Sequence, residues 1–457
     1  MDTFKINPID NVCVDLHSGH KIACCDINAG DDVIKYGMPI GMATCFIKSG
    51  DSVHSHNLKT KLGDLLNYKY SGGVKALQLS EPFMINAYVR KNGDIGIRND
   101  VFIIPTVGCV NSTAKANADK TGAIHVTHPY GCSQLGDDMS VTQHILKGLI
   151  KHPNAGGVLV LGLGCENNNI DEMKKVLGCV DEDRIKFLNT QDCEDEISVG
   201  VEIVTRLQKQ AQNDVREPVP VSRLKVGLKC GGSDGYSGIT ANPLVGVVTD
   251  RLVSMGATAV LTEVPEMFGA ETVLFERCEN EAVFNKCVDL INNFKQYFKD
   301  HGEPVSENPS PGNKEGGITT LEEKSLGCVQ KGGKAPVVDV LDYGDTAVKP
   351  GLNLLNGPGN DIVSVTNLTA CGCHMVLFTT GRGTPLGGIV PTVKIASNEA
   401  IAERKSNWID FCAYSLDHAE KATELLELIK ETADGKQTKN ELNNCREIAI
   451  FKDGVTL

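Results

Sequence analysis

The sequence lacks the features that mark several large classes of protein. Its 457 residues contain no apolar run long enough to span a bilayer, and its first residues lack the apolar stretch of a signal peptide. Positive charge is also scarce, since 45 Lys and Arg against 58 Asp and Glu give a formal net charge of -13. Sequence-independent binding to nucleic acid or anionic membranes requires clustered basic residues. We therefore expect a cytoplasmic protein with a small-molecule ligand and with neither nucleic-acid nor membrane partners.

Several motifs of nucleotide enzymes, hydrolases and disulfide scaffolds are missing as well. There is no Walker A sequence and no Gly-x-Ser-x-Gly elbow, and Gly162-Leu163-Gly164-Cys165-Glu166-Asn167 lacks the third glycine of the dinucleotide fingerprint. The 17 cysteines are odd in number and show no Cys-x-x-Cys spacing. We therefore expect reduced thiols rather than a disulfide framework or a zinc ribbon.

The distribution of glycine and hydrophobic residues predicts a small β-rich domain followed by two α/β domains. Short β-type segments run from residue 10 to 58, so we assign residues 1–66 to the first domain and 67–86 to a linker. Strands then alternate with helical periodicity, which favours mainly parallel sheets. The proline-rich residues 216–220 predict a joint between α/β domains at 87–215 and 222–457, and we find no internal repeat. Strands are expected at residues 101–104, 123–127, 158–163, 185–188, 226–228, 257–261, 337–341 and 375–378.

Three cysteines stand beside glycine where predicted strands end: Cys132, Cys165 and Cys230. Ligands of open α/β sheets bind outside the carboxyl ends of the strands, so three thiols placed there indicate a site. Each one alone also fits the ordinary pattern of a buried, apolar cysteine. As a set, they are natural ligands for iron, either as a single ion or in a cluster.

Histidines of the N-terminal domain offer a second set of metal ligands. His54-Ser55-His56 places two imidazoles on one face of a strand, where both can bind one divalent ion. A polar strand end exposed to water explains the same pattern equally well. His17 and His20 lie in the same domain and could complete a site. The run Cys371-Gly372-Cys373-His374, by contrast, directly precedes an apolar strand, which favours a structural role.

Two glycine-rich loops carry a basic residue each. Residues 308–317 are too polar for a core and present Lys314 among backbone donors. Residues 379–385 follow a predicted strand and place Arg382 beside Thr384, a suitable receptor for a carboxylate. Plain surface turns are the alternative for both loops. The position after a strand favours a binding role for the Arg382 loop.

Seven long and unusual runs together resemble the altronate/galactarate dehydratase family: residues 51–57, 105–111, 130–138, 162–168, 230–234, 308–317 and 381–385. The resemblance extends from about residue 11 to the C-terminus. It implies a SAF-type β-clip domain at the N-terminus, followed by the α/β domains. It also implies a hydro-lyase of hexuronate catabolism that converts D-altronate to 2-dehydro-3-deoxy-D-gluconate and water, with Fe²⁺ or Mn²⁺ as cofactor. Related enzymes act on galactarate or sulfolactate, and a homo-oligomer is compatible with the sequence.

Dehydration of a 2,3-dihydroxy acid removes a proton beside the carboxylate and expels hydroxide. Four residues are candidates for the acid and the base: His20, His128, Glu166 and Asp234. Lys314, Arg382 and Thr384 are candidates for binding the substrate, and a divalent metal would act as a Lewis acid.

Two metal sites stay open at this point. His54 and His56 suit a mononuclear ion that meets hard oxygen donors, and we prefer this site. An iron–sulfur cluster would instead use Cys132, Cys165 and Cys230. A sugar-acid sensor or iron-binding protein without catalysis is the alternative from another class.

Overall fold

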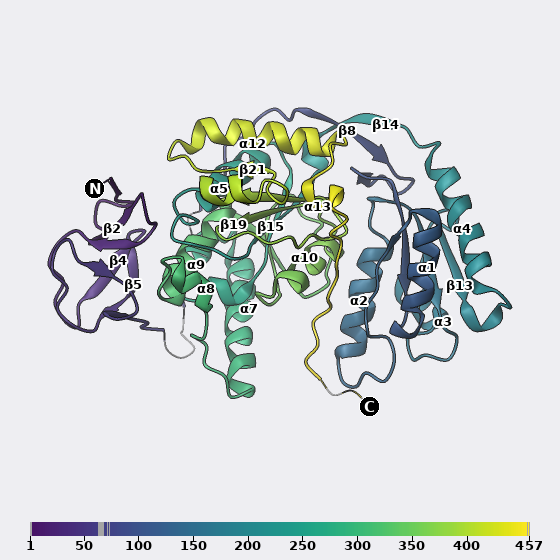
Figure 1. Ribbon diagram of the computed structural model, residues 1–457, viewed down its shortest axis with the longest axis horizontal. Coiled ribbons are helices and arrows are strands. Elements are labelled where there is room, and N and C mark those ends of the chain that lie inside the picture. Colours follow the sequence, from purple (N-terminus) through teal and green to yellow (C-terminus); the bar gives the residue numbers. More distant parts are fainter. Residues whose placement is uncertain (1, 63–67, 71, 73, 455, 457) are drawn as a thin grey trace.

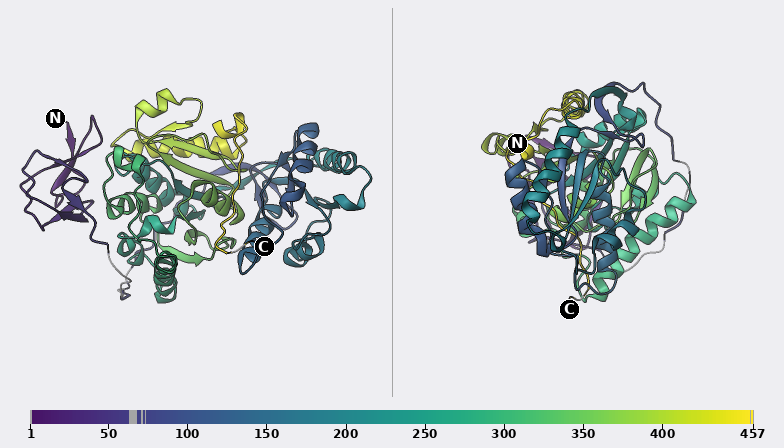
Figure 2. Two further views of the ribbon diagram at one scale, coloured as in Figure 1. Left: turned by 60° about the horizontal axis from the view of Figure 1, so that its bottom comes forward. Right: turned by 90° about the vertical axis from the view of Figure 1, so that its right-hand side faces the viewer.

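Three domains lie along the long axis of the molecule, in an order that differs from their order in the chain. The computed structural model describes residues 2–62, 68–70, 72, 74–454 and 456. The N-terminal β domain and the second domain lie at opposite ends, and the C-terminal domain lies between them (Figure 1; Figure 2). The predicted fold class, a small β domain followed by two α/β domains, is confirmed. Within these residues, no helix is both long and apolar enough to cross a membrane.

The N-terminal domain contains two small antiparallel sheets. Their strand orders are β1-β2-β3-β6 and β4-β5-β7. Inward-facing Val12, Val33, Ile40 and Val53 are fully buried, while alternate residues reach solvent, as expected for half-buried strands. The strands are β1 (Thr3–Phe4), β2 (Val12–Asp15), β3 (Lys21–Ala23), β4 (Asp32–Lys35), β5 (Met38–Ala43), β6 (Ser52–Val53) and β7 (Leu58–Lys59).

This domain has an internal two-fold repeat, so our prediction of no repeat was wrong. Ile27 and Ile47 exchange backbone hydrogen bonds of 2.8 and 2.9 Å. Gly30 and Gly50 occupy equivalent turns with φ of 89° and 91°, values that favour glycine. The N–H of each donates to the other half of the domain. The repeat is also present in the sequence, because residues 23–33 and 43–53 share the pattern Ala-x-Cys-x-Ile-x-x-Gly-Asp-x-Val at a spacing of 20 residues.

The second domain is a four-stranded parallel sheet in the order β11-β10-β12-β13, with helices on both faces. In β10, Val101 and Ile103 pack toward α1 and α4, while Phe102 and Ile104 pack toward α2 and α3. This alternation places one apolar layer on each side of the sheet. The elements are β10 (Asp100–Pro105), β11 (Ile124–His125), β12 (Ala155–Gly162), β13 (Ile185–Asn189), α1 (Asn111–Thr121), α2 (Asp138–Ile150), α3 (Ile170–Leu177) and α4 (Glu196–Ala211), with short η1 (Gly108–Val110) and η2 (Thr190–Asp192).

A separate antiparallel sheet joins the second and C-terminal domains. It has the order β14-β8-β9, with β8 (Met84–Val89), β9 (Ile95–Gly96) and β14 (Arg216–Pro220). The prolines that predicted a joint therefore lie in an edge strand, where a missing N–H is tolerated. The expected linker at 67–86 lies partly outside the described residues, and its last three residues belong to β8.

The C-terminal domain is a seven-stranded parallel sheet in the order β17-β18-β16-β15-β19-β20-β21. Buried Asn353 in β18 and Lys394 in β20 interrupt the apolar runs, which explains why these two strands were not predicted. The strands are β15 (Lys225–Cys230), β16 (Thr258–Leu261), β17 (Val337–Leu341), β18 (Gly351–Leu355), β19 (Met375–Thr380), β20 (Thr392–Ala396) and β21 (Phe411–Cys412). The helices are α5 (Ala241–Ser254), α6 (Glu271–Phe275), α7 (Glu281–Asp300), α8 (Pro311–Glu315), α9 (Leu321–Cys328), α10 (Asp361–Ala370), α11 (Glu399–Arg404), α12 (His418–Ala433) and α13 (Lys439–Leu442), with short η3 (Val221–Arg223), η4 (Val264–Met267) and η5 (Val329–Gly332).

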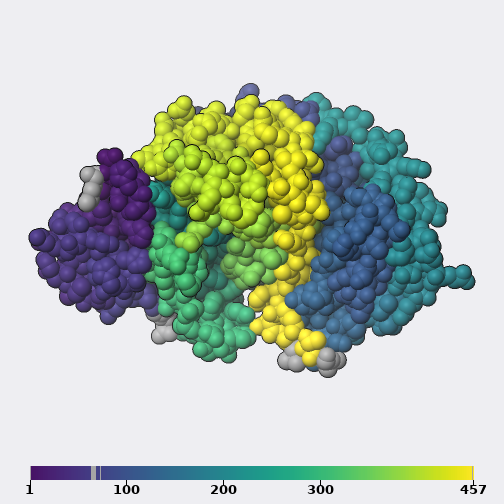
Figure 3. All heavy atoms as spheres, in the orientation of Figure 1, coloured from purple at the N-terminus to yellow at the C-terminus, as the bar shows by residue number. Residues whose placement is uncertain are grey.

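The C-terminal segment fastens the C-terminal domain to the second domain. It runs along the seam between them on the face shown in Figure 3. The backbone N–H groups of Asp453 and Gly454 donate to the carboxylate of Asp138 at 2.9 and 2.8 Å. The guanidinium of Arg98 also reaches across this boundary and donates two hydrogen bonds to the carboxylate of Glu441, at 2.7 and 2.9 Å. Buried, bidentate pairs of this kind fix orientation well.

Candidate active site

The sheet of the C-terminal domain changes direction between β15 and β19. From β15 the chain continues to β16 on one side, whereas β19 lies on the other side. Such a switch point opens a crevice at the carboxyl ends of the strands, where open α/β sheets bind ligands. The loops after β15 and β19 carry Asp234 and Arg382. The backbone N–H of Arg382 donates to the carbonyl of Gly232 at 2.9 Å, so the two loops lie together.

Asp234 lies at the centre of this edge but is not free to exchange protons. Its carboxylate accepts hydrogen bonds from Ser237, Ser397 and Asn398 at 2.8 to 2.9 Å, and the side chain is buried. Burial raises its pKa, while the hydrogen bonds oppose that shift. These contacts tie the loops after β15 and β20 together, which gives Asp234 a structural role.

Helix α8 places two charged residues over the same edge. Its Asn313 donates to the carbonyl of Ser233 at 2.8 Å and so anchors the helix to the loop after β15. Arg382 forms an ion pair of 3.0 Å with Glu315, and both side chains are largely exposed. Lys314 is exposed and makes no side-chain ion pair within the described residues. The hydroxyl of Thr384 accepts the N–H of Leu386 at 3.2 Å and can still donate.

The N-terminal domain contributes two imidazoles to this edge. The Nε2–H of His54 donates to the carbonyl oxygen of Lys314 at 2.9 Å, and its Nδ1 forms a hydrogen bond of 3.0 Å with the hydroxyl of Ser55. The ring of His20 lies 5.7 Å from that of His54 and contacts the backbone of Glu315. Burial, followed by the neighbouring His54, lowers the pKa of His20. His20 is therefore neutral near pH 7 and suited to accept a proton.

A buried ion triad holds the N-terminal domain on the C-terminal domain. The carboxylate of Glu323 in α9 pairs with Lys21 and Lys35 at 2.8 Å each, and all three side chains are almost inaccessible to solvent. Burial alone would raise the pKa of Glu323, but the two ammonium groups lower it to about 2. Burial lowers the pKa of Lys21 to about 8 despite its carboxylate partner. Because the triad is fully desolvated, the N-terminal domain is a fixed part of the site.

The strongest metal-binding group lies beneath this edge and was not predicted. Cys230, Glu266 and Cys328 are buried, with ligand atoms 2.9 to 3.3 Å apart. Glu266 follows β16 and Cys328 ends α9, so the three residues are far apart in sequence. Among the residues described, they are the one group of three or more candidate ligands that fits a single ion. The sequence did offer one signal for this metal-binding group, since carboxylates follow soon after an apolar strand in Glu263-Val264-Pro265-Glu266.

The charges around this group suit a divalent cation. The Cys230 sulfur lies 3.0 Å from the ammonium of Lys331, and Glu266 pairs with Lys324 at 2.8 Å. Lys229 pairs with Glu263 at 2.5 Å and with Asp361 at 2.8 Å. With both thiols and the three carboxyl groups ionised, five negative groups face three ammonium groups. A divalent ion would balance the remaining two charges.

Without an ion, the thiol of Cys230 holds its proton. The hydrogen bond with Cys328, followed by burial, raises the pKa of Cys230 well above its ordinary value. Burial alone would raise the pKa of Glu266, but Lys324 and Lys331 lower it to about 2. Two thiolates and a carboxylate suit iron better than manganese, which prefers oxygen ligands. The cavity beside Cys328 is only about 10 Å³, so the group is closed to bulk solvent.

Other candidate ligands and bases lie apart from this group. Cys132 and Cys165 belong to the second domain, so the structure does not join them to Cys230. His56 is exposed, and within the described chain it forms no three-ligand group with His54. His128 is buried, with Nε2 donating to the Pro105 carbonyl at 2.8 Å and Nδ1 accepting an N–H. Both of its nitrogens are thus occupied.

Glu166 also lies in the second domain, where its carboxylate organises a loop. It accepts the hydroxyl of Thr106 at 2.6 Å and the N–H groups of Leu163 and Gly164 at 3.0 and 2.6 Å. Burial alone would raise the pKa of Glu166, but the hydrogen bonds from Thr106 and Gly164 lower it. A carboxylate held in this way is a poor general base.

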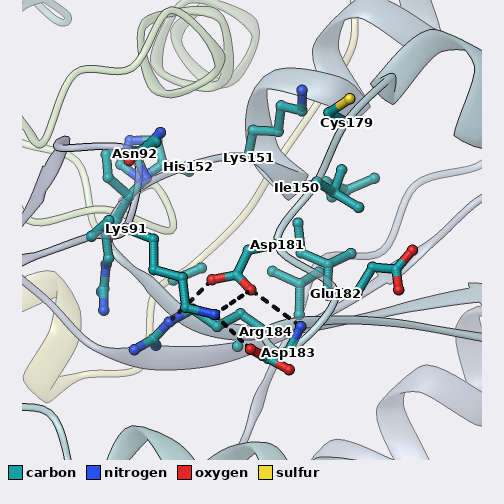
Figure 4. Close-up of a pocket in the computed structure, with 17 residues that line it drawn as sticks. Lys91, Asn92, Ile150, Lys151, His152, Cys179, Asp181, Glu182, Asp183 and Arg184 are labelled. Atoms are coloured by element: carbon teal, nitrogen blue, oxygen red, sulfur yellow. Dashed lines mark hydrogen bonds and ion pairs between the residues drawn. The ribbon is translucent and has the colours of Figure 1, made fainter.

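A cavity lies at the edge of the second-domain sheet where β12 and β13 begin. It measures about 620 Å³ and is lined by the first residues of β12 and β13 (Figure 4). Lys91 forms ion pairs there with Asp181 and Asp183 at 3.2 and 2.5 Å. Because ligands of open parallel sheets bind at the carboxyl edge, size alone does not make this cavity the active site.

The switch-point edge of this open α/β sheet carries guanidinium, imidazole and ammonium groups, and the thiol–carboxylate group lies beneath them. This arrangement is typical of an enzyme that acts on a small anionic substrate. Comparison with known proteins supports this class. Three family models match: the altronate/galactarate dehydratase SAF domain over residues 11–61, the second domain of D-galactarate dehydratase/altronate hydrolase over 87–212, and the C-terminal domain of D-galactarate/altronate dehydratase over 221–456. The chain belongs to the D-galactarate/altronate dehydratase family.

Individual relatives are similar over nearly their whole length. Altronate dehydratase of Escherichia coli (strain K12) is 52% identical, with 100% of both chains covered. Altronate dehydratase of Bacillus subtilis (strain 168) is also 52% identical, over 97% of this chain and 93% of the relative. Galactarate dehydratase (L-threo-forming) of Escherichia coli (strain K12) is 31% identical, over 92% of this chain and 86% of the relative.

Proposed function

We propose that this chain is a hydro-lyase that dehydrates D-altronate to 2-dehydro-3-deoxy-D-gluconate. The observation that carries this proposal is the 52% identity, over the full length, to altronate dehydratase of Escherichia coli (strain K12). The galactarate dehydratase of the same organism is only 31% identical. Altronate is therefore the preferred substrate, and galactarate and sulfolactate are the alternatives to test.

Arg382 is proposed to bind the substrate carboxylate. Its exposed guanidinium pairs with Glu315 at 3.0 Å in the free protein, and a substrate carboxylate would replace that partner. Lys314 and Thr384 are proposed to bind hydroxyl groups, since the ammonium has no ion-pair partner among the residues that the structure describes and the hydroxyl can donate. These three groups come from α8 and the loop after β19, on the switch-point edge.

His20 is proposed as the general base. It is the only one of the four acid–base candidates that is neutral, partly exposed and beside the Arg382–Glu315 pair. Its imidazole would take the proton from C2 while the C3 hydroxyl leaves as water. Lys314 would donate a hydrogen bond, or its proton, to that leaving hydroxyl. The enol that results becomes the 2-keto acid.

Cys230, Cys328 and Glu266 are proposed to hold iron. The donor set and the charge balance support a thiophilic divalent ion. Iron bound there would supply Lewis acidity to substrate oxygen atoms that reach it. The closed space beside Cys328 means that a sugar acid reaches it only after neighbouring side chains move.

A 2-keto acid assay with ferrous ion tests the proposal on altronate, galactarate and sulfolactate. We expect turnover of altronate, and His20→Asn should lower kcat at least tenfold. His17→Asn is the matched control, because His17 lies in the same loop but its side chain is 75% exposed and lies 3.9 Å from Asp2. Turnover of galactarate or sulfolactate alone would refute the substrate. Binding of altronate without turnover of any of the three would refute catalysis in favour of a sensor.

A further inference from the structure

A second cavity lies at the boundary between the second and C-terminal domains, and it measures about 480 Å³. Its walls come from the end of α2, from η3, from the first residues of β15 and β16, and from the loops between β8 and β9 and between β17 and β18. Because β15 and β16 begin here, the cavity lies at the edge of the C-terminal sheet opposite the proposed altronate site. It shares part of its wall, including Asn92 and Lys151, with the cavity of Figure 4.

Four cationic side chains line this cavity without a counter-ion. They are Lys147 and Lys151 at the end of α2, Arg223 in η3 and Lys225 in β15. None of the four forms an ion pair with any residue that the structure describes. Lys225 donates to the carbonyl of Ala347 at 2.8 Å, and Arg223 donates to the carbonyl of Gly93. Burial, followed by the neighbouring Lys147, lowers the pKa of Lys151, as expected for ammonium groups gathered without an opposite charge.

The charge around the cavity is unbalanced, although the whole chain has a formal net charge of -13. Among the described residues of the wall, Asp94 carries the one carboxylate, so three positive charges are in excess. Burial lowers the pKa of His152 to about 4 and that of His374 well below its ordinary value, so both imidazoles are neutral near pH 7. Helices α2 and α10 also end here, and each C-terminus carries about half a negative charge. About two positive charges are left over.

Three hydroxyl groups in the wall are available to a ligand. They belong to Ser222, Thr258 and Thr346, and none has a hydrogen-bond partner within the described part of the chain. Thr258 is the clearest case, because it is only 6% exposed and lines the cavity. Buried hydroxyl groups are nearly always hydrogen-bonded. A bound ligand would supply the partner that Thr258 lacks.

Direct contacts between the two domains hold the walls of the cavity at a fixed separation. The side-chain amide of Asn154 donates to the carbonyl of His374 at 2.9 Å. A Cβ at Gly148 would collide with the carbonyl of Ala370, so α2 packs directly on α10. The cavity is therefore formed before any ligand arrives, as is usual for binding sites of small molecules.

We propose that this cavity binds a phosphate monoester of a small polyhydroxy compound, which bridges the second and C-terminal domains. A phosphate monoester carries nearly two negative charges near pH 7, which matches the positive charge left over in the wall. Three of the four cations are lysines, which bind phosphate as point charges, and the hydroxyl groups can donate to phosphate oxygens. The volume of about 480 Å³ exceeds what phosphate alone requires and leaves room for the organic part.

Calorimetric titration of the full-length protein, without substrate, tests this site. Glucose 6-phosphate and glycerol 3-phosphate are the probes, and glucose, inorganic phosphate and succinate are titrated for comparison. We expect at least one of the two esters to bind with a Kd below about 1 mM. The three comparison compounds should bind at least about tenfold more weakly than that ester.

Variants of the wall locate the bound ester. Lys151→Gln and Arg223→Gln should each weaken its binding at least about tenfold, since each removes a charged donor. Thr258→Val keeps the shape of the side chain and should weaken binding about fivefold. Lys209→Gln is the matched control, because Lys209 stands in the last turn of α4, as Lys147 does in α2, but lies outside the cavity. This control should keep the affinity of the wild type.

Hydrogen exchange of the wild type with and without the ester is a second measurement, which does not depend on folding of the variants. Amides at the end of α2 and in residues 371–374 should exchange more slowly with the ester bound. Unchanged exchange there, binding of neither ester, or equal weakening in Lys209→Gln would refute the site. Equal affinity for inorganic phosphate would refute recognition of the organic part, and equal affinity for succinate would refute phosphate. None of these outcomes involves turnover, so failure of the proposed dehydratase activity would leave this test unaffected.

Discussion

Replacing Glu323 with glutamine should loosen the N-terminal domain. The substitution keeps the shape of the side chain but leaves the ammonium groups of Lys21 and Lys35 buried without a counter-charge. The fall of the Glu323 pKa from 4.5 to about 2 corresponds to about 3 kcal/mol in favour of the charged native form. Removing one partner of a buried ion pair costs about 3–5 kcal/mol by direct measurement in other proteins. We therefore expect a loss of about 3 kcal/mol.

Hydrogen exchange resolved by peptide is the assay for this prediction. Amides of β3 and β4, which carry Lys21 and Lys35, should exchange at least about a hundredfold faster in Glu323→Gln. Lys61→Gln is the control, because Lys61 and Asp32 form a surface pair with side chains 47% and 37% exposed. Such exposed pairs contribute about 0–1 kcal/mol. If the two variants exchange alike, the triad does not hold the domain, and the reasoning is wrong.

Three further predictions concern the site. The affinity of the Cys230 group for iron should rise from pH 6 to 8, because the pKa of Cys230 is raised and binding of the metal therefore displaces a thiol proton. Competition with a chelator measures this affinity. In the same assay, Cys328→Ser should weaken iron binding at least about tenfold. The acid limb of kcat/KM should have its midpoint below 6.5, since the pKa of His20 is lowered and the neutral imidazole is the active form. Arg382→Lys should raise KM about tenfold with little change in kcat, because lysine cannot bind a carboxylate through two bonds; steady-state kinetics decide this.

The fold could be predicted wherever apolar runs were uninterrupted. Strand β10 was expected at residues 101–104 and spans Asp100–Pro105, and β17 agrees at both ends. Strands β18 and β20 were missed because Asn353 and Lys394 looked incompatible with a core. Asn353 bonds to backbone carbonyls at 3.0 and 3.1 Å, and Lys394 donates to the carbonyl of Thr384 at 3.0 Å. Asn353 finds its partners within its own segment, at Lys349 and Gly351, whereas Lys394 takes its partner from the loop after β19, so both polar side chains are hydrogen-bonded where they are buried.

The site could be predicted only in part, for a similar reason. Arg382 and Lys314 were found because each stands in a loop of recognisable composition. Glu266 and Cys328 are separated by 62 residues and approach within 3.1 Å only after α9 packs beside η4. Glycine-flanked cysteines pointed correctly to strand ends. The sequence pattern could not show that Cys230 and Cys132 follow strands of different sheets, since that depends on how the strands pair within each domain.

The buried triad has a consequence for the order of events during synthesis. Lys21 and its partner Glu323 are 302 residues apart in the chain. At translation rates of roughly 5–20 residues per second, the N-terminal domain waits roughly 15–60 s on the ribosome before its docking surface exists. During that interval the ammonium groups of Lys21 and Lys35 stay hydrated, and charge keeps the unpaired face soluble. We therefore expect the same two lysines, which are costly to bury in the finished protein, to oppose premature association of the nascent chain.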